Sequence, residues 1–116
     1  MALPIESELN GSTNGKPIPV AATATPGTTI HTASALGFEK VWLYASNVTA
    51  LDATLTIEWG GTSDPGDHIV KSYRIPAFSA PIRVTDGQII KASLLIRAFA
   101  SAGSAINLTG FVIAVR

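Results

Sequence analysis

The sequence has 116 residues, with eight basic and eight acidic side chains, no cysteine, 47% hydrophobic residues and only 14% charged residues. A chain of this length forms one domain. The lack of cysteine excludes disulfides, thiolate zinc sites and a cysteine nucleophile. The formal net charge of zero gives no basic surface for nucleic acid, and no apolar run reaches the ~20 residues of a membrane span. Because soluble domains usually contain roughly 25% charged residues, we expect much of this surface to face other protein.

Residues 1–17 are predicted to form an extended N-terminal arm. The stretch 10–17 is rich in Asn, Gly, Ser, Thr and Pro, and it has no core pattern. A frayed terminus is the alternative. The start of the chain has no basic segment, and Glu6 and Glu8 interrupt it early, so we expect no secretory signal. The apolar residues expected to anchor the arm on a neighbouring subunit are Leu3, Ile5 and Leu9.

Residues 18–116 are predicted to form one β-sandwich domain. Period-two alternation is clearest over 53–59, while Pro26-Gly27 and Asp86-Gly87 are turn signals. Strands are expected at 18–25, 28–33, 39–48, 53–59, 68–77, 81–85, 93–100 and 106–116. About eight short strands without a credible helix predict an all-β, antiparallel sandwich that is jelly-roll-like, with the strand order left open.

The last strand is apolar on both faces, since Phe111, Ile113 and Val115 alternate with Val112 and Ala114. The segment 41–44 is similar. In a two-layer sandwich only one face of each sheet meets the core, so the other face is predicted to meet another subunit. The alternative is that Trp42 and Tyr44 lie under a loop or under the arm. The predicted interface residues of these strands are Trp42, Tyr44, Phe111, Val112 and Ala114.

Few residues could carry chemistry, and we expect no catalytic residue, no cofactor and no metal. His31 and His68 lack a nucleophile-elbow pattern nearby. Asp64 and Asp67 could offer oxygen ligands to Ca²⁺, although aspartate is also a favoured turn residue. The aromatic residues that could stack on a sugar are Trp42, Tyr44, Trp59, Tyr73 and Phe78.

Two segments carry a family resemblance: VWLYASNVTALDATLTIEWGGTSDPGDHI at 41–69 and LLIRAFASAGSAINLTGFVIAVR at 94–116. The chain resembles small virion-associated β proteins of tailed bacteriophages. The resemblance implies a non-enzymatic head decoration (cement) protein on the capsid exterior, assembled in the bacterial host cytoplasm. It also implies self-association as a homotrimer and contacts with the major capsid protein, with residues 1–17 suited to a clamping arm. The alternative is a carbohydrate- or receptor-binding module of a phage tail fibre or spike.

Overall fold

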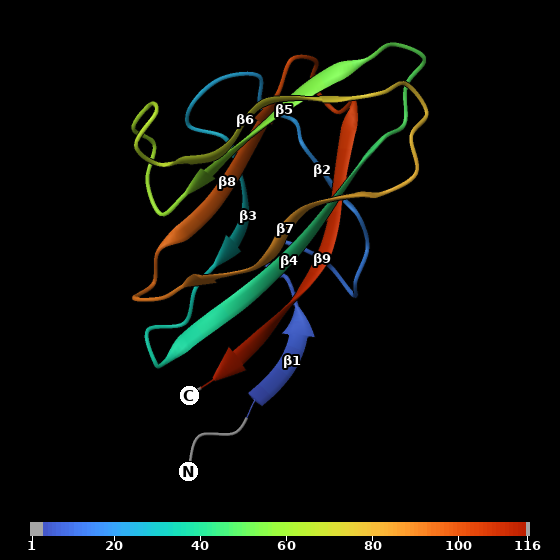
Figure 1. Ribbon diagram of the computed structural model, residues 1–116. Coiled ribbons are helices and arrows are strands. Elements are labelled where there is room, and N and C mark those ends of the chain that lie inside the picture. The colour runs from blue at the N-terminus through green and yellow to red at the C-terminus, as the bar shows by residue number, and fades with distance from the viewer. Residues whose placement is uncertain (1–3, 116) are drawn as a thin grey trace.

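The computed structural model describes residues 4–115, which form nine strands (Figure 1). These residues contain no helix, and hence none long and apolar enough to cross a membrane. The strands are β1 (Pro4–Glu8), β2 (Ile18–Pro19), β3 (Thr28–Thr32), β4 (Phe38–Asn47), β5 (Ala53–Trp59), β6 (His68–Ile75), β7 (Ile82–Ile90), β8 (Leu95–Ala100) and β9 (Ile106–Val115).

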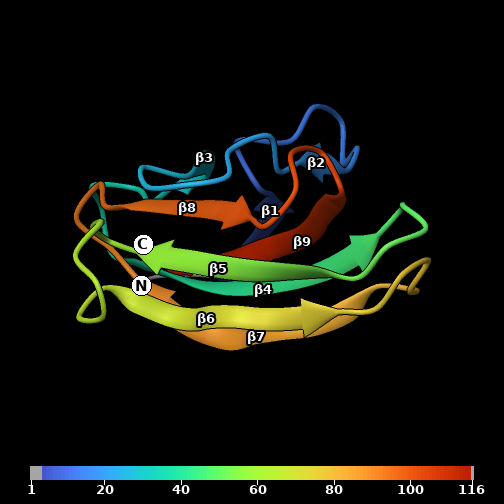
Figure 2. The same ribbon diagram turned by 90° about the horizontal axis from the view of Figure 1, so that it is seen from above.

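The strands make two antiparallel sheets that face each other (Figure 2). Sheet A has the order β1-β9-β4-β7, and the short β2 also pairs with β9. Sheet B has the order β3-β8-β5-β6. The prediction of an all-β sandwich is therefore confirmed, with nine strands instead of about eight.

The core lies between the two sheets and is built from the inward residues of the long strands. Val41 and Leu43 of β4 and Leu55 and Ile57 of β5 are fully buried. β4 has one face toward the core and the other toward solvent. Every second side chain from Glu39 to Asn47 is therefore buried, and the side chains between them are partly or fully exposed. The same alternation runs through β9 and fixes which of its faces points outward.

The interface prediction was wrong for three residues. Val112 and Ala114 have no exposed surface and belong to the inward face of β9, opposite Val41 and Glu39 of β4. Leu9 is 1% exposed and joins the same core, because the chain turns back after β1 and the Gly11 amide donates to the Ile30 carbonyl oxygen. These side chains cannot contact a partner while the domain is folded.

Residues 4–8 form β1, which pairs with β9 along the border of sheet A. All five residues of β1 are exposed, and Ile5 is 49% exposed. Leu3 lies outside the described residues. Whether residues 1–17 serve as an arm stays a prediction.

The predicted turn at Asp86-Gly87 was wrong, since β7 continues through both residues to Ile90. The pairing register of β4 with β7 shifts between Val41 and Trp42, and Trp42 lies opposite Asp86. Gly87 is the bulged residue, with φ of 77°. Glycine populates positive φ without steric cost, so the same local signal serves a bulge as well as a hairpin turn. The predicted strand at 18–25 is also shorter, and only Ile18–Pro19 pairs.

Candidate functional site

The outer face of sheet A carries a group of apolar side chains on β4 and β9, with Lys40 of β4 among them. The register places Phe38 opposite Val115 and Trp42 opposite Phe111, so these pairs share one face. Each of the six is partly exposed. This group, termed the apolar face of sheet A, consists of Phe38, Trp42, Tyr44, Phe111, Ile113 and Val115. It contains three of the predicted interface residues: Trp42, Tyr44 and Phe111.

Trp42 is held in place by both neighbouring strands. Its ring stacks on Phe111 of β9 with centroids 5.0 Å apart and an interplanar angle of 11°. Gly87 of β7 lies so close that a Cβ there would stand 2.9 Å from Cζ2 of the indole. The indole Nε1 donates to Asp86 Oδ1 over 3.2 Å. Trp42 is thus a packed part of the face, and it is not a free stacking platform for a sugar.

Charged residues lie beside the apolar face and within it. Glu6 and Glu8 of β1 lie beside Ile113 and Phe111 in the register and form a charged border on that side. Lys40 lies inside the face, between Phe38 and Trp42 on β4 and opposite Ile113. All three charged residues are exposed. A charged border is typical of a protein interface, and Lys40 adds one charge to the interior of the face.

His31 forms a buried pair with Glu39 that links the two sheets. His31 Nε2 is 2.7 Å from Glu39 Oε1, with side chains 3% and 4% exposed. The backbone N–H of Asn10 donates to His31 Nδ1. The proton of the neutral ring is therefore on Nε2, which donates it to Glu39. Every polar atom of the imidazole has a partner, which assigns His31 a structural role.

Glu58 and His68 form a second buried group. The Glu58 carboxylate accepts hydrogen bonds from the Gly27 amide and the Thr25 hydroxyl, which ties the 20–27 segment to sheet B. His68 Nε2 is 4.0 Å from Glu58 Oε2, and its Nδ1 is 3.4 Å from Asp64 Oδ1. The two ring nitrogens face different carboxylates, and within residues 4–115 no three potential ligands converge on a metal position.

The carboxylates considered for Ca²⁺ are engaged by the loop itself. Asp67 accepts a hydrogen bond from the Ser63 amide. Asp64 pairs with Lys71 Nζ at 2.7 Å, and this hydrogen bond holds the pKa of Asp64 below its usual range. These bonds support the turn interpretation of the loop.

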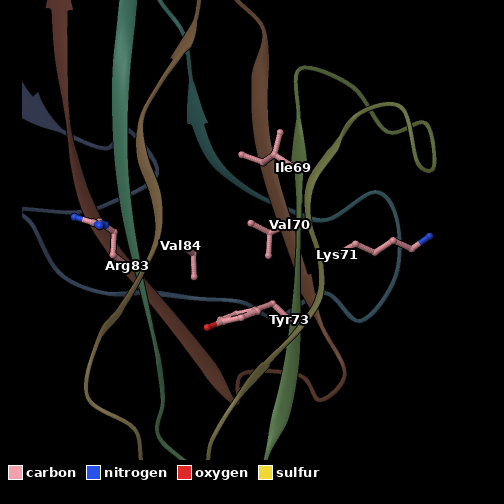
Figure 3. Close-up of a pocket in the computed structure, with 6 residues that line it drawn as sticks. All are labelled: Ile69, Val70, Lys71, Tyr73, Arg83 and Val84. Carbon is pink, nitrogen blue, oxygen red and sulfur yellow. The ribbon is translucent and has the colours of Figure 1, made fainter.

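A shallow cleft of about 390 Å³ lies between β6 and β7, and no sequence pattern indicated it (Figure 3). The cleft lies where the border strand of sheet B, β6, meets the border strand of sheet A, β7. Its position is therefore set by the strand order of the two sheets. Its apolar lining comes from Ile69, Val70, Tyr73 and Val84.

Comparisons with protein-family models, curated proteins and solved structures give no match for this chain.

Proposed function

We propose that this chain is a non-enzymatic structural protein of a phage virion, a head decoration protein that self-associates and binds the major capsid protein. The observation that carries the proposal is the apolar face of sheet A. A sandwich that works as a monomer usually presents polar side chains on its outer faces. Here two adjacent strands present six apolar side chains, with Lys40 among them and Glu6 and Glu8 beside them.

We further propose that the architecture is a jelly roll. Chain order supports it, because every connection from β3 to β9 crosses to the other sheet except the β5–β6 hairpin. Jelly rolls are found in viral capsid and lectin domains. A fold does not by itself determine a function, so this supports the proposal only together with the apolar face.

The apolar face supports a contact that is weak for one copy and strong on a lattice. Its side chains are only partly exposed, so each offers less than the 1.5–3 kcal/mol of a fully buried apolar side chain. Association also costs several kcal/mol of lost freedom. Repetition of one modest contact over a particle surface compensates through avidity.

Binding to undecorated capsids tests the proposal. The purified chain, characterised first by light scattering, is incubated with capsids and sedimented with them. We expect co-sedimentation of the wild type and its loss in Ile113→Glu, which removes an apolar side chain of the face and places a carboxylate between Glu6 and Lys40. Thr29→Glu, at an exposed position opposite Arg97 in sheet B, is the matched control and should bind normally. A monodisperse monomer that ignores capsids would end the proposal.

A further inference from the structure

One end of the sandwich presents an apolar projection built from two connections. Residues 48–52 join β4 to β5, residues 76–81 join β6 to β7, and the two connections lie side by side (Figures 1 and 2). Leu51 is 78% exposed and Phe78 is 72% exposed, the highest values for large apolar side chains within residues 4–115. Val48 beside them is also exposed. Val48, Leu51 and Phe78 are termed the apolar tip.

The apolar tip is held rigidly by polar bonds. The Phe78 amide donates to the Thr49 carbonyl oxygen over 3.0 Å, which joins the two connections. Asp52 accepts from the Ala77 amide over 2.9 Å and pairs with Arg74. Phe78 has φ of 50°, a left-handed conformation that is unfavourable for a bulky side chain. A bulky exposed side chain in this conformation is an outlier that motivates a functional hypothesis for Phe78.

The cleft between β6 and β7 is an open hollow with a largely apolar lining. Ile69, Val70 and Tyr73 point from β6 toward β7, and Val84 lies opposite them (Figure 3). Its volume is about 390 Å³. A cavity of roughly 150 Å³ accommodates a benzene ring. The cleft therefore has room for one aromatic side chain and an aliphatic neighbour.

The cleft is suited to neutral side chains rather than to an added strand or an anion. The pairing of β6 with β5 and of β7 with β4 is interrupted by register shifts, and such bulged borders disfavour strand addition. The bordering cations are already paired, Lys71 with Asp64 at 2.7 Å and Arg83 with Asp86 at 3.8 Å.

We propose that the apolar tip of one copy inserts Phe78 and Leu51 into the β6–β7 cleft of the next copy. The tip matches the cleft in apolar character and in charge, because the charged neighbours of both are paired, Asp52 with Arg74 at the tip and Lys71 with Asp64 at the cleft. The proposal rests on the proposed function only in that the chain self-associates.

This contact joins two different surfaces, so it is heterologous and generates a closed ring or a filament. The tip lies at one end of the long axis, whereas the cleft opens along the flank made by β6 and β7 (Figure 2). Successive copies therefore turn relative to one another, as they must in a ring such as the expected trimer.

Two variants and their mixture test the contact by sedimentation velocity. Phe78→Asn removes the ring while suiting the backbone, because asparagine tolerates positive φ. We expect an unchanged or higher melting temperature and self-association weakened at least about 30-fold, as for an interface hot spot. Ala92→Asn has a similar φ of 60° in the β7–β8 connection, away from the tip, and should associate like the wild type.

Tyr73→Glu fills the cleft with charge beside Lys71 and Arg83 and leaves the tip intact. Alone it should be monomeric. Mixed with Phe78→Asn it should form a 1:1 heterodimer that grows no further. In this heterodimer the intact tip of Tyr73→Glu inserts into the intact cleft of Phe78→Asn, and the remaining tip and cleft are both altered. The mixture is measured at protein concentrations up to about 100-fold above the midpoint of wild-type self-association. This range is needed because a closed ring gains avidity that a dimer with one contact lacks.

Normal self-association of Phe78→Asn, a monomeric mixture or a monomeric wild type would each overturn the tip contact. Capsid binding is scored separately. A wild type that forms the tip contact but ignores capsids contradicts the virion role alone. A chain that binds capsids while Phe78→Asn self-associates normally contradicts the tip contact alone.

Discussion

Replacing Trp42 by alanine should destabilise the domain as well as remove part of the apolar face. Burial of a large aromatic side chain is typically worth 3–5 kcal/mol in such a substitution. Trp42 is partly exposed, which reduces this to about 2–3 kcal/mol. The loss of the hydrogen bond to Asp86 adds at most about 1 kcal/mol. We therefore expect a loss of roughly 2–4 kcal/mol in the free energy of unfolding.

Urea unfolding of Trp42→Ala, Phe111→Ala and the double variant measures this loss and its origin. Stacked aromatic pairs contribute about 0.5–1.5 kcal/mol beyond burial, so the cycle should give a coupling energy of that size. A loss below about 1 kcal/mol together with no coupling would refute the assignment of Trp42 as a packed side chain. In that case a capsid-binding defect of Trp42→Ala would report a lost contact directly.

Three further substitutions test other parts of the structure. Glu39→Ala should cost about 1–3 kcal/mol in urea unfolding because it leaves the buried His31 Nε2 donor without an acceptor, while Glu39→Gln, which still accepts its proton, should cost less. Gly110→Ala should cost at least about 3 kcal/mol, since its Cβ would meet the β4 backbone at 2.0 Å; a normal melting temperature would contradict this close approach. The pKa of Asp52 is lowered from 3.8 by the Ala77 amide and an arginine ion pair, so its stabilisation is present above pH 4 and lost below. Melting temperatures from pH 2 to 7 should therefore fall less steeply at the acid end in Asp52→Asn.

Local patterns predicted the strands of the sandwich where apolar and polar residues alternate along the chain. Ala53–Trp59 was located to the residue because its inward side chains are apolar over the whole strand. β1 was not foreseen, since Pro4–Glu8 is exposed throughout and owes its conformation to pairing with β9. A strand that is defined by its neighbour and not by burial has no signature in its own residues.

The two-sided apolar pattern of β9 correctly indicated an outer apolar face, but the pattern could not say which side chains face outward. That choice depends on register: Val112 lies opposite Val41 in the core, so Phe111 and Ile113 face out. A shift of one residue would have exchanged the two faces. The cleft and the apolar tip could not be anticipated either, because both depend on which strands from different sheets lie at the same border.

We propose that the apolar face of sheet A is the surface that meets the capsid. An electron-microscopy map of capsids incubated with the chain tests this most directly. We predict density in which β4 and β9 lie against the shell, with Trp42 and Ile113 covered by the major capsid protein. A map in which sheet A faces solvent, or in which no copies are bound, would contradict the claim.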